Sequence, residues 1–235
     1  RIRPILMTAL ATGLALLPIG TGNDWARQWQ LPTSPVACLT KIKAENFKFQ
    51  DAGLVHFTKN GEPDQRFFIN VAGMAYDAFV TRAAEQNTGF GGYYALIIKC
   101  LWKYEPTPSR LFFVEKNEKP APETVVDDSF YTINIGLCRF SGGGMQFVPQ
   151  AVPDDGLFAL TFVRKLPKWA VVMQTPRFFN GKIGDHPKVT CTQARSVRVE
   201  HLPGQPPVLL EADGEFLGES PARFEILPGA LKVFC

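Results

Sequence analysis

The sequence predicts a two-domain α+β fold, with part of an α/β unit over residues 1–30 and an antiparallel β-sandwich over residues 31–235. Two observations predict it. An apolar stretch, a glycine-rich loop and a helix start follow one another before residue 31, which is the order found in α/β units. After Leu31, short β-rich runs alternate with Gly, Pro and Asp turns, which is typical of antiparallel sandwiches and barrels.

The first apolar stretch, within residues 1–20, has a basic start and could be a signal peptide. We favour a buried element of the fold, because no initiator Met is present and no AxA-like cleavage site precedes the next motif. No other stretch approaches the roughly 20 apolar residues that span a bilayer. Any membrane contact is therefore expected to be peripheral.

The β-rich part begins with residues 36–59, which resemble a hairpin or meander. Residues 65–74 are predicted to form a buried strand that ends at Gly73. Further strands are predicted at SRLFFVE, SFYTINIGLCRF, GLFALTFVRKL, ARSVRVEHL, PPVLLEADGEFL and ARFEILPGALKVF. Their number and spacing favour a sandwich or a barrel-like sheet.

One helix is predicted over residues 92–104, and Pro106 ends it. Its apolar stripe consists of Tyr94, Ile97, Ile98, Leu101 and Trp102, at helical spacing. We interpret the stripe as a face packed on a sheet, with a lipid-binding helix as the alternative.

The composition excludes several classes of protein. With 46% hydrophobic and 20% charged residues the chain is globular, and a net charge of +3 is too small to indicate nucleic-acid binding. Five cysteines without a CxxC pair indicate free thiols in a reducing compartment. The three histidines lack zinc-site spacing, and no GxSxG motif supports a hydrolase.

The loop Gly20-Thr21-Gly22-Asn23 is the first candidate site. Its glycines can turn backbone N–H groups toward an anion and Thr21 adds a hydroxyl donor, so the loop can cradle phosphate. It does not match GxxxxGK[ST], however, and Asn23 or Asp24 could simply cap a helix. The residues alone leave both interpretations open.

The second candidate is Asp213-Gly214-Glu215, which follows a β-like run. Two carboxylates separated by one residue on a strand point the same way, so Asp213 and Glu215 could face one site and act on a hydroxyl as general base and orienting group. An Asp-Gly pair is also a common hairpin turn, and from turn preference alone the turn is favoured.

The third candidate combines the run Gly142–Gly144 with the loop Val152–Leu157. Asp155 beside exposed loop carbonyls suits a hard cation such as Mg²⁺ or Ca²⁺. An ordinary Asp-Gly turn is the alternative, and by itself it is favoured.

The segments LLPIGTGNDWAR, NVAGMAYDAFV, GGGMQFVPQAVPDDGLF and LLEADGEFLGESPARFEILPGALKVF occur in this order. Together they resemble the diacylglycerol kinase catalytic family, in its bacterial-type lipid kinase branch, over Leu16 to Cys235. The family is related to sphingosine kinases and, more distantly, to NAD kinases. The GTGN sequence, where sphingosine kinases usually have GSGN, favours the diacylglycerol kinases.

The resemblance implies an N-terminal α/β domain that holds ATP and a C-terminal β-sandwich that carries the lipid site. Gly20, Thr21, Gly22 and Asn23 would belong to the nucleotide loop, with Thr21 in direct contact. Glu215 would be the general base and Asp213 its neighbour in the catalytic cluster. A structural Mg²⁺ would be held by Asp155 and by the backbone carbonyls of Val152 and Leu157.

The function implied by the resemblance is ATP-dependent transfer of the γ-phosphate to a hydroxyl of a membrane lipid. Diacylglycerol, giving phosphatidic acid for phospholipid biosynthesis, is the first substrate expected, with a sphingoid base or phosphatidylglycerol as alternatives. A cytoplasmic enzyme in peripheral membrane contact is expected, without nucleic acid, and a homodimer is left open. A soluble NAD kinase explains GTGNDWAR and the ADGE motif poorly.

One departure from the family pattern is the lack of a GGDGT loop, which the family places upstream of GTGND. The roughly twenty residues before the GTGND loop are fewer than a whole α/β domain requires. Either the chain lacks segments of a longer protein or it is a remnant. If it were complete, we would expect no kinase activity but a lipid-binding or regulatory module.

Overall fold

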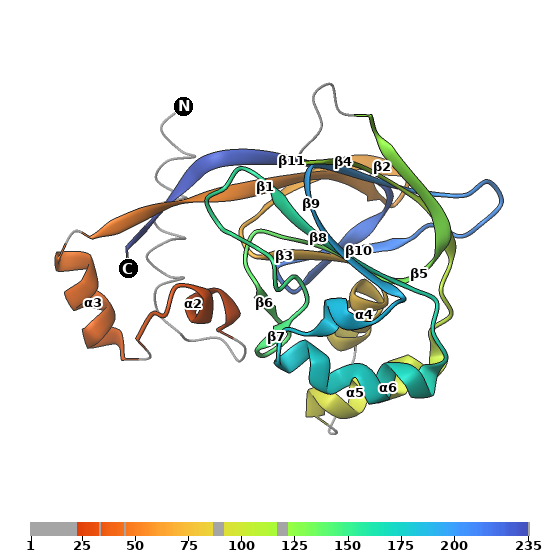
Figure 1. The fold of residues 1–235 in the computed structure, drawn as a ribbon, viewed down its shortest axis with the longest axis horizontal. Coiled ribbons are helices and arrows are strands. Elements are labelled where there is room, and N and C mark those ends of the chain that lie inside the picture. The colour runs from red at the N-terminus through yellow and green to blue at the C-terminus, as the bar shows by residue number, and fades with distance from the viewer. Residues whose placement is uncertain (1–22, 33, 45, 87–91, 117–121, 235) are drawn as a thin grey trace.

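The body of the protein is an antiparallel sheet covered on one side by helices (Figure 1). The computed structural model describes residues 23–32, 34–44, 46–86, 92–116 and 122–234. Its strands are β1 (Phe47–Lys59), β2 (Glu62–Phe68), β3 (Val71–Ala75), β4 (Pro108–Glu115), β5 (Thr124–Gly136), β6 (Phe140–Ser141), β7 (Met145–Gln146), β8 (Phe158–Arg164), β9 (Val189–His201), β10 (Leu209–Ala212) and β11 (Glu215–Phe234). Its helices are α2 (Asp24–Gln28), α3 (Pro35–Lys43), α4 (Tyr76–Gln86), α5 (Gly92–Lys103), α6 (Lys168–Phe179) and the short 3₁₀ helix η1 (Ile183–Asp185).

The main sheet has the strand order β2-β1-β11-β10-β3-β5-β4-β9-β8 and closes on itself, because β9 also pairs with β11 and β5 with β8. Every pairing among the described strands is antiparallel. The antiparallel β-rich part is thereby confirmed, and its closure makes it barrel-like. The long strands β5, β9 and β11 each pair with different partners along their length, which leaves fewer free edges.

Aromatic residues fill the interior of the closed sheet. Phe68, Phe158 and Phe224 are almost fully buried, and the ring centroids of Phe68 lie 6.0 Å from Phe158 and 6.2 Å from Phe224. Phe130 and Phe162 form a second pair at 5.5 Å, edge to face. Rings of this size bury large apolar areas and dominate the energy of a core.

Two predicted elements differ from the structure, and two helices were not predicted. Residues 36–43 belong to helix α3, because Ser34 and Pro35 occupy the first positions of a helix rather than a strand. The strand expected over residues 65–74 is divided into β2 and β3, and β3 continues past Gly73 to Ala75. Helices α4 and α6 were not predicted, and in α6 an internal Pro176 masks the helical pattern.

Helix α5 is confirmed, but its inward face is rotated from the predicted one. Leu101 and Tyr104 are buried and Ile97 is half-buried, while Ile98 and Trp102 are more than half exposed. The rotation follows from a contact with α4, where the Tyr76 hydroxyl donates a hydrogen bond to the Ile97 carbonyl at 2.6 Å.

The described cysteines are free thiols, as expected. No helix within the described residues is both long enough and apolar enough to cross a bilayer. The boundary between two domains at residues 30 and 31 stays a prediction, because residues 1–22 lie outside the described part.

The short helix α2 is held to the sheet by the buried side chain of Gln50. The indole N–H groups of Trp25 and Trp29 both donate to Gln50 Oε1, at 2.8 and 2.7 Å. Gln50 Nε2 in turn donates to the Ile69 carbonyl. One amide therefore joins α2, β1 and the segment between β2 and β3.

Replacing this amide should destabilise the fold. In Gln50→Leu, two buried indole donors and one carbonyl lose their partner, so we expect the free energy of unfolding to fall by roughly 2 to 4 kcal/mol. Urea denaturation followed by tryptophan fluorescence measures it. Gln65→Leu, at an exposed position on β2, is the control. Equal stability of the two variants would rule out this role for Gln50.

Candidate active site

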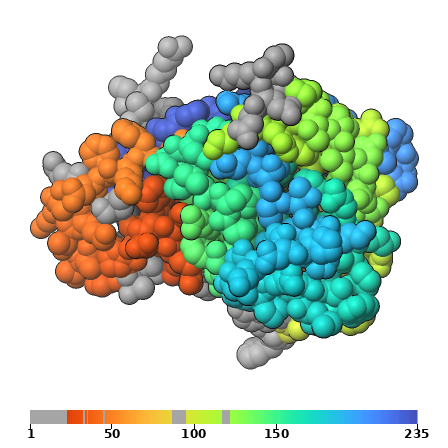
Figure 2. Space-filling model, viewed as in Figure 1, coloured from red at the N-terminus to blue at the C-terminus, as the bar shows by residue number. Residues whose placement is uncertain are grey.

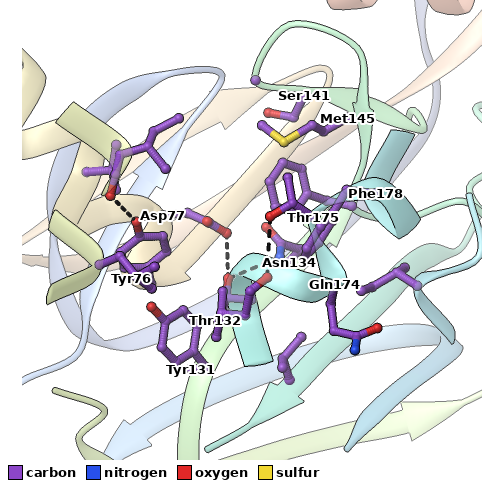
Figure 3. Close-up of a pocket in the computed structure, with 18 of the residues that line it drawn as sticks. Tyr76, Asp77, Tyr131, Thr132, Asn134, Ser141, Met145, Gln174, Thr175 and Phe178 are labelled. Atoms are coloured by element: carbon purple, nitrogen blue, oxygen red, sulfur yellow. Dashed lines mark hydrogen bonds between the residues drawn. The ribbon is translucent and has the colours of Figure 1, made fainter. Parts of the chain in front are cut away.

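A cavity of about 760 Å³ lies between the sheet and helices α4, α5 and α6 (Figure 3). Its walls are mainly apolar and include Leu101, Val171 and Phe178. The polar side chains of Asp77, Thr132, Asn134 and Glu211 also line it. The size and lining match those of pockets that bind small organic molecules.

The polar groups converge because Gly73 has no side chain. Gly73 on β3 pairs with Glu211 on one side and with Asn134 on the other, so these two side chains share a face of the sheet. A Cβ atom at Gly73 would lie 2.5 Å from Glu211 Oε1 and 3.0 Å from Asp77 Cβ. Only glycine leaves room for both carboxylates above this strand.

Asp77 is placed at the first turn of α4, directly after β3. Ala75 has a positive φ of 72°, and this turn brings the helix start back over the strand. Asp77 Oδ2 accepts a hydrogen bond from the Thr132 hydroxyl, whose oxygen accepts one from Asn134 Nδ2 at 3.1 Å. Figure 3 shows the three side chains pointing toward one another.

The environment favours the protonated forms of both carboxyl groups. Burial raises the pKa of Asp77 to about 6, against the lowering effect of the hydrogen bonds from Thr132 and Asn134. Burial also raises the pKa of Glu211 well above its usual value, and the nearby charge of Asp77 adds to this effect. Both carboxyl groups therefore bind a proton more tightly than exposed carboxyl groups do.

The Asp213-Gly214 pair forms a two-residue hairpin turn between β10 and β11, with φ values of 51° and 84°. The local turn interpretation is therefore correct. The expectation that Asp213 and Glu215 alternate along one strand is wrong. Asp213 accepts hydrogen bonds from the amides of Ile69 and Asn70, both at 2.9 Å, and so fixes the junction of β2 and β3.

Glu215 is the carboxylate of this motif that faces solvent. Its side chain is 62% exposed and pairs with Arg66 Nη2 at 2.6 Å. Gly214, its neighbour, lines the cavity. Glu215 thus directly follows a residue that lines the cavity, but its own side chain does not line it.

The described part of the GTGND loop begins at Asn23, which has a left-handed φ of 50° and directly precedes α2. Gly20, Thr21 and Gly22 lie outside the described residues. Asp24 does not cap the helix: its Oδ2 accepts a hydrogen bond from the Gly143 amide at 2.8 Å. Burial raises the pKa of Asp24, opposed by the amides of Gly143 and Gly144 and by Arg27.

The run Gly142–Gly144 forms the turn between β6 and β7 and contacts the start of α2 rather than the Asp155 loop. All three glycines have positive φ, between 63° and 101°. Ser141 and Gly142 also line the cavity. Segments of two candidate motifs, the glycine turn and the hairpin that precedes Glu215, therefore line one cavity. The start of α2 contacts the glycine turn through Asp24.

The Asp155 loop lies apart from the residues that line the cavity. Asp155 accepts hydrogen bonds from the Leu157 amide at 3.1 Å and from Gln193 Nε2 at 2.8 Å. Asp51 accepts from the amides of Gly156 and Gly229 and so closes the same turn.

The donor chemistry of this loop fits a hard cation. Burial raises the pKa of Asp155, and the charge of Asp51 adds to it, so a cation would offset unfavourable negative charge. The described residues contain no group of three or more His, Cys, Asp or Glu side chains that could hold a metal. A cation here would therefore depend on main-chain carbonyls and water besides Asp155.

Comparison with known protein families shows to which family the chain belongs. A family model described as the YegS C-terminal NAD kinase beta sandwich-like domain matches residues 70–235. The chain belongs to this family of lipid-kinase-type proteins. A diacylglycerol kinase of Mycobacterium tuberculosis is 30% identical over 224 residues, covering 94% of this chain and 68% of that protein. A probable YegS-like lipid kinase of Pseudomonas aeruginosa is 28% identical, covering 96% of this chain and 70% of that protein.

The YegS-type fold is also seen in solved structures. A putative diacylglycerol kinase from Bacillus anthracis superposes with a TM-score of 0.63 at 21% identity, over 92% of this chain and 66% of that one. A second diacylglycerol kinase structure from the same organism has a TM-score of 0.60 at 19% identity and is covered to 64%. At these identities the likeness shows the fold. The chain spans about two thirds of the length of these relatives.

Within this YegS-type chain, Asp77 and Glu211 are site residues that were not predicted, although both lie in the family-like segments. Glu211 carried a usable signal, because an acidic residue inside the apolar run VLLEA is expensive to bury unless it is partnered. Asp77 carried none, since its partner Thr132 is 55 residues away in sequence.

Asp77 should make the stability of the chain depend on pH. Its pKa is about 6 in the folded chain against an ordinary value of 3.8, so the folded chain binds the proton more tightly than the unfolded chain. The stabilisation is full below about pH 4 and is lost as the pH rises through about 6.

We expect the stability of the wild type to fall relative to Asp77→Asn over this range and the difference to level off above it. Urea unfolding of both proteins from pH 4 to pH 8 measures the difference. Parallel curves for the two proteins would contradict the shifted pKa of Asp77.

Proposed function

We propose that this protein is an ATP-dependent lipid kinase that phosphorylates a hydroxyl of a membrane lipid, with diacylglycerol as the first substrate. The observation that carries the proposal is the cavity, which is apolar along α5 and α6 and carries the polar groups of Asp77 and Glu211 beside the turn that precedes Glu215. An amphipathic molecule with a long apolar part and a hydroxyl fits a cavity that has one apolar and one polar region. The relatives named diacylglycerol kinase support the same class of reaction.

In this proposal the acyl region lies between α5 and α6, and the glycerol end lies near Asp77, Thr132 and Asn134. The Tyr131 hydroxyl, which lines the cavity, has no hydrogen-bond partner among the described residues. Burial, with the charge of Asp77, raises its pKa, so it remains a neutral donor. Such a donor suits an ester carbonyl of the substrate.

Glu215 would take the proton from the attacking hydroxyl as general base. Arg66 pairs with its side chain at the surface, next to the cavity-lining Gly214. Asp213 would be a positioning residue, because its hydrogen bonds with the amides of Ile69 and Asn70 hold the turn that precedes Glu215. Phosphoryl transfer depends mainly on alignment and charge neutralisation, so a fixed base beside an oriented hydroxyl accounts for much of the catalysis.

ATP would be held by the loop Gly20, Thr21, Gly22 and Asn23, next to Asp24 and the glycine turn. Mg²⁺ would have two separate roles. One ion would accompany the nucleotide and neutralise phosphate charge. A second, structural ion would be held by Asp155 and the carbonyls of Val152 and Leu157. Peripheral contact with the membrane follows from the substrate. A sphingoid base and phosphatidylglycerol are the alternative acceptors.

Glu215→Gln tests the general base. Because the side chain is exposed, we expect normal folding and a turnover lower by about two to four orders of magnitude. The assay follows label from ATP to mixed micelles of diacylglycerol, sphingosine and phosphatidylglycerol with the full-length protein. Glu225→Gln, a half-exposed glutamate on the same strand, is the control.

Near-normal turnover of Glu215→Gln would remove this residue from the role of base. No transfer to any lipid by the folded wild type would instead favour an inactive lipid-binding module.

Mg²⁺ at the Asp155 loop should stabilise the fold. We expect Mg²⁺ to raise the melting temperature of the wild type over its value in EDTA by roughly 2 to 8 °C, because the cation binds the folded chain alone. Asp155→Ala should melt lower and lose the response, whereas Asp154→Ala, at the exposed neighbour, should keep it. Identical wild-type melting with and without Mg²⁺ would refute a structural metal at this loop.

A further inference from the structure

Helices α5 and α6 expose an unusual number of large apolar side chains. Each is between 45% and 68% exposed, and they are Ile98, Trp102, Trp169, Val172, Met173 and Phe179. We call this set the apolar face. Figure 2 shows α6 at the surface, well away from α2 and α3. Clustered exposed apolar residues of this kind usually mark a surface that binds something.

The two helices present one continuous surface. Lys168 Nζ at the start of α6 donates to the Trp102 carbonyl and to Glu105 Oε1, both at 2.7 Å, which ties the helices together. Ile98, Val172 and Phe179 belong both to the apolar face and to the lining of the cavity. The apolar part of the cavity is therefore continuous with this surface.

The charges around the apolar face are mainly positive, and Glu105, which pairs with Lys168, follows directly after α5. Neither residues 92–104 nor residues 165–182 contain an Asp or a Glu, although the chain has 22 acidic residues. The same two segments contain six cations, namely Lys99, Lys103, Lys165, Lys168, Arg177 and Lys182. Exposed tryptophans among residues of net positive charge are complementary to an anionic lipid surface.

We propose that the apolar face is the membrane-docking surface of this protein, and that it seats the open side of the cavity in an anionic bilayer. The inference rests on the proposed function, because only a lipid substrate needs this path. Moving an acyl chain through water costs about 0.8 kcal/mol per CH₂ group. A cavity that opens into the bilayer avoids that cost, since the chain passes from one apolar environment to another.

A second copy of the chain is the rival occupant of the apolar face. A symmetric dimer would place the same patch on both subunits face to face. The six cations of these two segments would then oppose their counterparts, and the single adjoining Glu105 would not balance them. This repulsion favours an anionic membrane over a second copy.

Tryptophan fluorescence tests the docking directly. The chain has four tryptophans, of which Trp25 and Trp29 are buried while Trp102 and Trp169 are exposed. We expect a blue shift when the wild type meets vesicles of phosphatidylcholine with about one third phosphatidylglycerol, and a much weaker one with phosphatidylcholine alone.

The double variant Trp102→Ser/Trp169→Ser should lose the blue shift and bind these vesicles at least about tenfold more weakly in flotation. Its remaining tryptophans, held by Gln50, report that the fold is intact. Phe67→Ser, at an equally exposed aromatic on β2, is the control and should bind like the wild type.

Two kinase assays on the full-length protein separate docking from chemistry. The double variant should lose activity on long-chain diacylglycerol in vesicles and keep it on a short-chain, water-soluble diacylglycerol, because neither tryptophan lines the cavity. A wild type that is active on both substrates but does not bind vesicles would overturn the docking surface and leave the kinase in place.

A wild type that binds vesicles through this face but phosphorylates neither substrate would support docking and reject the kinase. Unchanged vesicle binding in the double variant, with a change from dimer to monomer in sedimentation, would assign the face to a second copy and overturn the proposal.

Discussion

Gly73 lies between Glu211 and Asn134 in three adjacent strands, with the first turn of α4 folded back above it. Because it has no side chain, the carboxyl groups of Glu211 and Asp77 both fit against the same stretch of backbone. Any Cβ there would separate β3 from α4 or displace Glu211. The polar region of the cavity, its raised pKa values and the position of α4 all depend on this one missing atom.

A buried carboxyl pair is costly, and here the sheet and the turns supply its compensation. The amide of Gly214 donates to Glu211 at 2.9 Å, and the Thr132 hydroxyl donates to Asp77. Buried polar groups need such partners, and among the described residues that line the cavity the Tyr131 hydroxyl and Gln174 Oε1 are buried without one. These two groups could therefore bind a polar group of a substrate in the cavity.

Local signals in the sequence predicted local structure well. The alternating runs became strands, Pro106 followed the end of α5, and Asp213-Gly214 formed a hairpin turn. Features that depend on distant partners could not be predicted. The hydrogen bonds of Asp213 need the amides of Ile69 and Asn70, and the contact of α5 with α4 needs the hydroxyl of Tyr76. Only the folded chain brings these residues together, so these contacts cannot be predicted from spacing along the sequence.

The same argument explains why the stripe on α5 supported two interpretations. A helix that covers a cavity needs an apolar inner side, and Leu101 and Ile97 supply it. It needs an apolar outer side only if its environment is apolar as well, and Trp102, which is exposed and does not line the cavity, supplies that side. If the apolar face docks on a membrane as proposed, α5 packs on the sheet with one side and contacts lipid with the other. An apolar circumference broken mainly by lysines is what a helix between a protein core and a bilayer surface requires.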